Sequence, residues 1–145
     1  MRGSAGQPQP DGAPPLRLRG IRGAVCVGEN TPRAIEQAAR RLVEAIAQAN
    51  DLAPHQVVSA IFTVTADLDA QFPAVGARQA GWQEVPLLCA QEVPVPGSLP
   101  RCIRVLVHAY LPEGQGVRHV YLDGAEVLRP DWSGPADSMQ SLARG

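Results

Sequence analysis

The sequence predicts an α+β domain in which helices cover one face of a mixed β-sheet. The first observation is the order of elements: a strand, a long helix, a second strand, a short helix and then several strands. The second is that the long helical segment is apolar on one side only, as expected of a helix that packs on a sheet. The third is size, since 145 residues of which 45% are hydrophobic suffice for one core.

The first half of the chain predicts a strand followed by the long helix. Residues Leu18 to Val27 alternate between apolar and other residues well enough for a strand. Thr31 then supplies an N-cap and Pro32 the first helical position, while Asn50 and Asp51 end the helix. Its apolar positions recur at spacings of three and four: Ile35, Ala38, Ala39, Leu42, Val43, Ile46 and Ala49.

The second half predicts mostly strands. The run "VVSAIFTVT" is rich in β-branched residues and of strand length, and "FPAVGARQAG" favours a short helix between Pro73 and Gly81. Two further strands are expected in "EVPLLCAQEV" and "CIRVLVHAYL". The last element, "VRHVYLDGAEVLRP", is interpreted as a hairpin with its turn at Asp123 and Gly124.

Both ends of the chain differ in composition from the part between them. Residues 1–15 and 133–145 are rich in proline, glycine and polar residues, so we expect a flexible N-terminal arm and a flexible C-terminal tail around a folded domain of residues 16–132. There is no long apolar run and no signal-peptide pattern. We therefore expect a soluble, cytoplasmic protein that does not bind membranes.

The charges predict that any bound anion is held locally. Lysine and arginine total 13 against 14 aspartates and glutamates, so no overall field attracts nucleic acid. All of the basic residues are arginine, whose two-pronged guanidinium matches carboxylates. The three cysteines are widely spaced and the three histidines scattered, which predicts neither a metal site nor a cofactor.

Several polar residues interrupt strands that are otherwise apolar: Arg22, Cys89, Glu92, Arg104 and Tyr121. A charge inside a buried strand costs several kcal/mol, of order 3–5, unless it is paired or hydrated. These side chains are therefore expected to share a cavity. The alternative is that each is an exposed strand residue or part of an internal salt bridge, such as Glu92 with Arg104.

Five motifs in order resemble one family. "RGIRGAVCV", "FPAVGARQAGW", "VPLLCAQEV", "CIRVLV" and "RHVYLDGAEVLRPD" are similar to the monofunctional chorismate mutases of the trimeric α/β-barrel type (AroH class), over about Arg19 to Asp131. The resemblance implies an isomerase that converts chorismate to prephenate without a cofactor, in the synthesis of phenylalanine and tyrosine. It also implies a trimeric pseudo-α/β-barrel with active sites at the subunit interfaces.

The resemblance also implies roles for individual residues. Arg104 would take the ether oxygen and a carboxylate of chorismate, Arg22 and Tyr121 would hold a carboxylate, and Glu92 would take the hydroxyl together with the region of Leu88 and Cys89. Further positions match lining or entrance residues of the family: Phe72, Ala74, Arg78, Leu128 and Arg129.

Some features limit this comparison. Val75 stands where the family can place a lysine beside the pocket, and one-residue deletions fall before Gly81 and between Arg104 and Arg118. Arg19 is expected to share the strand face of Arg22.

Two other functions stay open: a trimeric deaminase of reactive imine or enamine intermediates, which shares the architecture, and a non-catalytic module that binds carboxylates.

Overall fold

The computed structural model describes residues 12–128 and contains one five-stranded sheet. Most of the expected arm, the expected tail and Arg129 lie outside the described residues. In chain order the elements are β1 (Leu16–Cys26), α1 (Pro32–Ala49), η2 (Pro54–Gln56), β2 (Val57–Val64), α2 (Pro73–Gln79), β3 (Leu87–Gln91), β4 (Cys102–Pro112), β5 (Val120–Leu122) and η3 (Ala125–Leu128).

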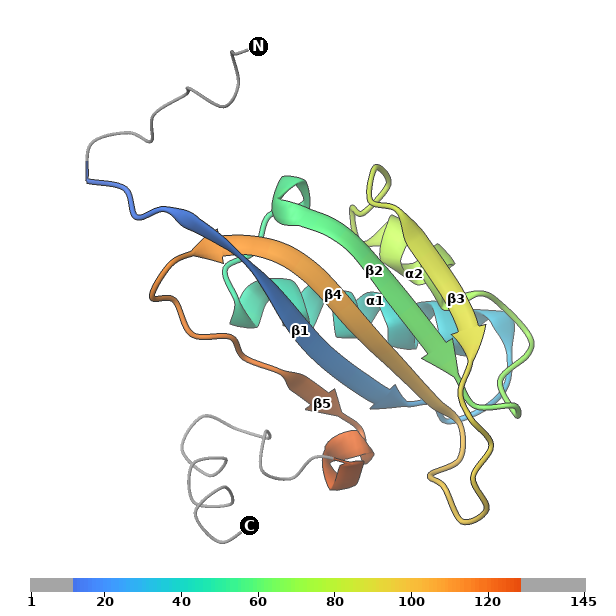
Figure 1. Cartoon of the computed structure of the whole chain (residues 1–145). Coiled ribbons are helices and arrows are strands. Elements are labelled where there is room, and N and C mark those ends of the chain that lie inside the picture. The colour runs from blue at the N-terminus through green and yellow to red at the C-terminus, as the bar shows by residue number, and fades with distance from the viewer. Residues whose placement is uncertain (1–11, 129–145) are drawn as a thin grey trace, which may run out of the picture.

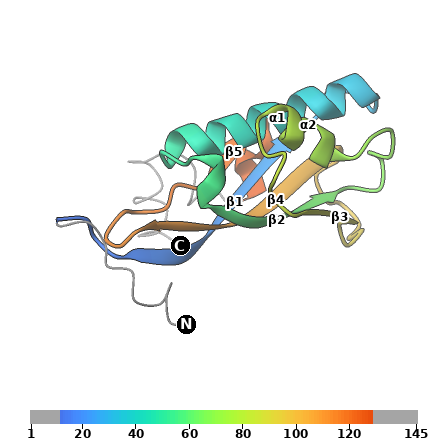
Figure 2. The same cartoon turned by 90° about the horizontal axis from the view of Figure 1, so that it is seen from above.

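The sheet is mixed, as the sequence predicts. Its strand order is β3-β2-β4-β1-β5, with β4 antiparallel to both β1 and β2 (Figure 1). The outer strands β3 and β5 run parallel to their neighbours. Seen from above, α1 and α2 both lie on one side of the sheet, which confirms the expected layer arrangement (Figure 2). We call this side the helix face and the other side the open face.

The core fills the space between the helix face and α1. Alternate residues of β1 and β4, such as Ile21, Val25 and Val107, are fully buried there. Against them pack the apolar positions of α1, which are the ones predicted from their spacing except for Ala49. The N-cap is also confirmed, because Thr31 Oγ1 accepts a 3.1 Å hydrogen bond from the backbone N–H of Ala34.

The second helix packs on the first at short range, and a glycine permits it. A Cβ atom placed on Gly76 would lie 2.4 Å from the carbonyl oxygen of Glu36 and 2.9 Å from Cβ of Ala39. Only a residue without a side chain fits at this crossing of α1 and α2. The close approach fixes α2, and with it the segment that precedes it, against the rest of the fold.

The expected C-terminal hairpin is wrong. Asp123 and Gly124 do form a tight turn, with φ values of 54° and 95°. The turn leads, however, from β5 into the 3-10 helix η3 and not into a returning strand. Glu126 explains the difference locally, because its carboxylate accepts a 2.8 Å hydrogen bond from the N–H of Gly124 and closes the chain into a helical turn.

A buried asparagine fixes the segment that leads into β5. The side chain of Asn50 is 2% exposed and donates to the carbonyl oxygens of Ile46 and Arg118, at 2.9 and 3.0 Å. It also accepts a 2.8 Å hydrogen bond from the N–H of Arg118. The residue that ends α1 therefore also positions the chain just before His119. No helix within residues 12–128 is long and apolar enough to span a membrane.

Candidate active site

The open face brings two of the predicted arginines to neighbouring strands. Arg104 on β4 stands opposite Ala24 of β1 and Thr63 of β2 in the strand register. Arg22 stands opposite Leu106, one position along the same face. Paired residues of antiparallel strands point to the same side of a sheet, so both guanidinium groups leave from the open face.

Glu92 joins this face from the end of β3. Its backbone N–H donates a 2.8 Å hydrogen bond to the carbonyl oxygen of Val64, which continues the parallel pairing of β2 and β3 by one residue. Its Oε1 atom accepts a 2.6 Å hydrogen bond from the hydroxyl of Thr63. The same Oε1 lies 4.0 Å from Nε of Arg104, and both charged side chains are somewhat more than a quarter exposed, at 28% and 29%.

The guanidinium of Arg104 has a hydrogen-bond donor, Nε, that is not used within residues 12–128. Its Nε atom is sealed from solvent and, among the described residues, has no hydrogen-bond partner. A charge-assisted N–H···O bond has a length of about 2.7–2.9 Å, so the 4.0 Å separation from Glu92 is not such a bond. Arg104 and Glu92 therefore form a long salt bridge, which is the alternative that the sequence leaves open, and no closer carboxylate contacts the Arg104 guanidinium within residues 12–128.

Tyr121 lies in β5, and Arg22 is positioned by the residue that precedes this strand. Tyr121 stands beside Ala24 in the parallel pairing of β1 and β5 and is 7% exposed. It belongs to a small second core on the open face, whose buried members are Ala24, Cys102, Tyr121 and Ala125. Arg22 is held through its backbone, because its N–H donates a 2.9 Å hydrogen bond to Nδ1 of His119.

Two cysteines lie on the open face at the second core, of which Cys102 is a buried member and Cys26 packs against it. Cys26 and Cys102 are opposite each other on β1 and β4. Burial raises the pKa of the Cys102 thiol to about 11, and burial together with the nearby Glu126 carboxylate raises the pKa of Cys26. Both side chains are therefore neutral thiols at physiological pH and pack as small apolar groups.

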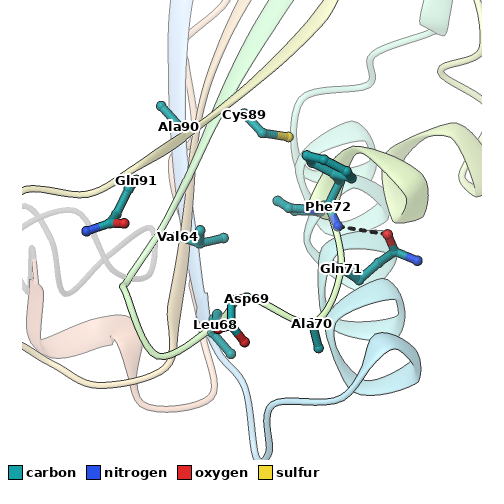
Figure 3. Close-up of a pocket in the computed structure, with 10 residues that line it drawn as sticks. Val64, Leu68, Asp69, Ala70, Gln71, Phe72, Cys89, Ala90 and Gln91 are labelled. Atoms are coloured by element: carbon teal, nitrogen blue, oxygen red, sulfur yellow. Dashed lines mark hydrogen bonds between the residues drawn. The ribbon is translucent and has the colours of Figure 1, made fainter.

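The remaining predicted residues belong to a different surface. Cys89 stands beside Phe62 in the register and packs against the core on the helix face. It lines a pocket of about 330 Å³ together with Phe72, Ala90 and Gln91 (Figure 3). Phe72 is the N-cap of α2 and is 66% exposed. Ala74 is buried in the first turn of that helix, and Arg78 is exposed in its last turn.

The structure thus separates the predicted residues into two groups. The open-face group contains Arg22, Glu92, Arg104 and Tyr121, joined by the exposed Leu88. The helix-face group contains Phe72, Ala74, Arg78 and Cys89. Leu128 in η3 packs against the second core. The pocket beside α2 is lined by Phe72 and Cys89 of the helix-face group and by none of the open-face group.

The expectation for Arg19 is wrong. It lies three residues before Arg22, and because side chains alternate along the unbroken register of β1, it points to the opposite face. Its guanidinium donates a 3.3 Å hydrogen bond to the carbonyl oxygen of Gln115. Arg19 therefore ties β1 to the chain that leads into β5, and it does not join Arg22.

Sequence reasoning missed two residues that position the open-face group, Thr63 and His119. Thr63 lies in a β-branched run, where threonine is common for its strand preference alone. His119 was one of three scattered histidines. Neither residue carries a spacing signal, because each acts across strands that are distant in sequence.

Comparisons with known proteins agree on one family. The family model described as chorismate mutase type I matches residues 18–132. "Chorismate mutase AroH" of Thermus thermophilus is 55% identical over 117 residues, which cover 79% of this chain and 95% of that protein. "Chorismate mutase AroH" of Bacillus subtilis (strain 168) is 45% identical over 121 residues, which cover 81% and 94%.

A solved structure agrees with the fold. The chorismate mutase from Clostridium thermocellum has a TM-score of 0.72 and 44% sequence identity to this chain. The match covers 75% of this chain and 98% of the solved one. At this identity, the similarity extends beyond the arrangement of strands and helices.

Proposed function

The chain belongs to the type I chorismate mutase family, and we propose that it isomerises chorismate to prephenate at a site built around Arg104, Glu92 and Arg22. It is an isomerase of aromatic amino-acid biosynthesis. The observation that supports the residue assignment is the open-face group, in which Arg104 has a buried Nε donor that lies 4.0 Å from Glu92 and has no hydrogen-bond partner within residues 12–128. Its expected location is the cytoplasm, which stays a prediction from the sequence.

The chemistry of the substrate explains the need for these side chains. Chorismate carries two carboxylates, one hydroxyl and an enol-pyruvyl ether, and it rearranges by breaking one C–O bond while one C–C bond forms. The reaction is internal to the substrate, so the enzyme has to hold the compact conformer and stabilise negative charge on the ether oxygen. Rigid guanidinium donors can do both.

Each open-face residue then has a role. Arg104 donates to the ether oxygen and to a carboxylate, because no carboxylate of the described residues lies closer to its guanidinium than the 4.0 Å of Glu92. Arg22 and Tyr121, on adjacent strands, bind the other carboxylate. Glu92 accepts a hydrogen bond from the substrate hydroxyl through Oε2, since the hydrogen bond and the ion pair of its side chain within residues 12–128 both involve Oε1.

We further propose that the site is completed by a second copy of the chain in a homotrimer. The helix-face group of Phe72, Ala74, Arg78 and Cys89 would come from the neighbouring subunit and close the pocket over the open-face group of the first. Support comes from the open face itself, which exposes large apolar side chains. These are Leu18, Ile61, Leu88, Leu106 and Tyr110. Burial of such a surface favours association of subunits.

The experiment that tests the activity is the loss of chorismate absorbance on addition of purified protein, with prephenate identified as the product. We expect turnover by the wild-type chain and its near-complete loss in Arg104→Ala. A protein that binds chorismate without consuming it would instead be a carboxylate-binding module. Consumption of an imine or enamine but not of chorismate would identify a deaminase.

A further inference from the structure

Glu92 and Arg104 on the open face lie farther apart than their opposite charges alone would predict. Glu92 and Arg104 carry opposite charges and are both partly withdrawn from solvent, yet Oε1 and Nε stand 4.0 Å apart. Nε is fully sealed from solvent and lacks a hydrogen-bond partner among the described residues. An unpaired buried donor is costly, so the carboxylate would be expected to close on it.

Thr63 supplies the competing contact. Its hydroxyl donates to Oε1 of Glu92 at 2.6 Å, within the range of a short charge-assisted O–H···O⁻ bond. Thr63 is also the residue directly opposite Arg104 in the pairing of β2 and β4. The Thr63 hydroxyl, on the strand next to that of Arg104, therefore holds the Glu92 carboxylate in place.

We infer that Thr63 is a positioning residue that holds Glu92 away from Arg104, so that the guanidinium stays available to the substrate and Oε2 of Glu92 is presented to the substrate hydroxyl. This inference rests on the proposed function of Arg104 and Glu92. Without the Thr63 hydroxyl, Glu92 closes on Arg104 and forms an ordinary ion pair. That ion pair competes with the developing charge on the ether oxygen for the same donors.

The test is the kinetics of Thr63→Val, which keeps the branched shape and removes the donor. We expect kcat to fall about tenfold to a hundredfold, the range for misplaced catalytic groups. KM changes less, because Arg22 and Tyr121 still hold the substrate carboxylate. Thr63→Ser retains a hydroxyl and restores most of kcat.

The chain provides a matched control on the same two strands. Ser59 and His108 are also paired across β2 and β4, and Ser59 Oγ lies 3.2 Å from Nδ1 of His108. Ser59→Ala therefore removes a comparable cross-strand contact of the open face and leaves kcat unchanged. If Ser59→Ala and Thr63→Val lower kcat equally, Thr63 is only a structural residue of the sheet and the inference fails.

A double mutant separates positioning from stability. In the Glu92→Gln background no carboxylate can close on Arg104, so adding Thr63→Val should cause little further loss of kcat. If Thr63→Val costs the same factor with and without the Glu92 carboxylate, the inference is overturned.

A second readout does not depend on activity. The Arg104 Nε–H resonance, assigned by its loss in Arg104→Lys, should move downfield in Thr63→Val as the new hydrogen bond forms. An unmoved resonance refutes the inference even if the protein is an active mutase. A moved resonance in a protein that does not turn over chorismate upholds the contact and refutes the proposed function instead.

Discussion

The backbone N–H of Arg22 donates a 2.9 Å hydrogen bond to Nδ1 of His119. Because Nδ1 is the acceptor, the neutral imidazole carries its proton on Nε2. His119 lies immediately before β5, which pairs with β1 one residue beyond Arg22. The arginine is thus fixed at its backbone by the segment that also brings Tyr121 to the site.

Removal of this acceptor should weaken substrate binding. His119→Ala leaves the Arg22 N–H without the ring nitrogen, at a cost of about 1–3 kcal/mol in the free energy of unfolding. We expect KM to rise more than kcat falls, because the carboxylate that Arg22 is proposed to bind is charged throughout the reaction. Urea unfolding and steady-state kinetics measure both effects, with His55→Ala at an exposed position as the control. An unchanged KM would contradict the role given to His119.

A methyl group added at Gly76, where α1 and α2 are in contact, should destabilise the fold. Gly76→Ala places a Cβ atom within 2.4 Å of the Glu36 carbonyl oxygen and 2.9 Å of Ala39. Overpacking of this kind costs about 1–3 kcal/mol or more, and we expect a lower midpoint of thermal unfolding. Gly28→Ala is the control, since a Cβ there meets nothing within 4 Å. Equal midpoints for the two variants would show that the helices can separate freely.

Cys102 should resist alkylation in the folded protein. Burial raises its pKa to about 11, so at pH 8 the reactive thiolate is a small minority. The fraction of thiolate grows as the pH approaches that value, so modification should accelerate between pH 8 and 10. Iodoacetamide followed by peptide mass spectrometry measures this, with the urea-unfolded chain as the reference. Rapid labelling of Cys102 at pH 8 in native protein would contradict its burial.

Assembly is tested by mass in solution. We expect light scattering to give the mass of a homotrimer at micromolar concentration, since the predicted site residues divide between two surfaces of one chain. Replacing the exposed Leu106 by Glu should place charge on the open face and shift the mass toward the monomer, with loss of activity. A monomeric wild-type protein that turns over chorismate would refute the shared site.

Periodicity predicted the fold well because the signals are local. The spacing of Ile35, Leu42 and Ile46 and the Thr31 cap defined α1, and β-branched runs located the strands. The predicted hairpin is wrong, although its turn at Gly124 is present, because the residues after the turn have a strand-like pattern that carries no sign of the hydrogen bond between Gly124 and Glu126. Local rules do not include the competition between a returning strand and a helical turn.

The site was predictable in residue types and less so in geometry. Polar residues on apolar strands indicated Arg22, Glu92 and Arg104, and β-sheet pairing then put them on one face. The prediction for Arg19 is wrong because Arg19 and Arg22 are three positions apart in β1, and their side chains therefore lie on opposite faces of the sheet. The hydrogen bonds of Thr63 and His119 link segments far apart in sequence, so only the folded register reveals them.

The prediction that a single measurement refutes most directly concerns Arg104. If its guanidinium stabilises charge that develops on the ether oxygen, its contribution appears mainly in the transition state. Arg104→Ala should then lower kcat by about two to three orders of magnitude, or roughly 3–4 kcal/mol, with a smaller change in KM. Arg104→Lys should recover only a minor part, because an ammonium restores the charge without the fork that spans ether oxygen and carboxylate.

Arg22→Ala is the control for the kinetic effect of Arg104→Ala. In the proposed site Arg22 holds a carboxylate that is charged in both ground and transition states, so KM should rise at least as markedly as kcat falls. If Arg104 served only to balance Glu92, Arg104→Ala would instead unfold the protein or leave activity within about tenfold of wild type. Kinetics on folded variants that have the same mass in solution as the wild type decides between the two, because a near-normal kcat in Arg104→Ala is compatible only with the structural role.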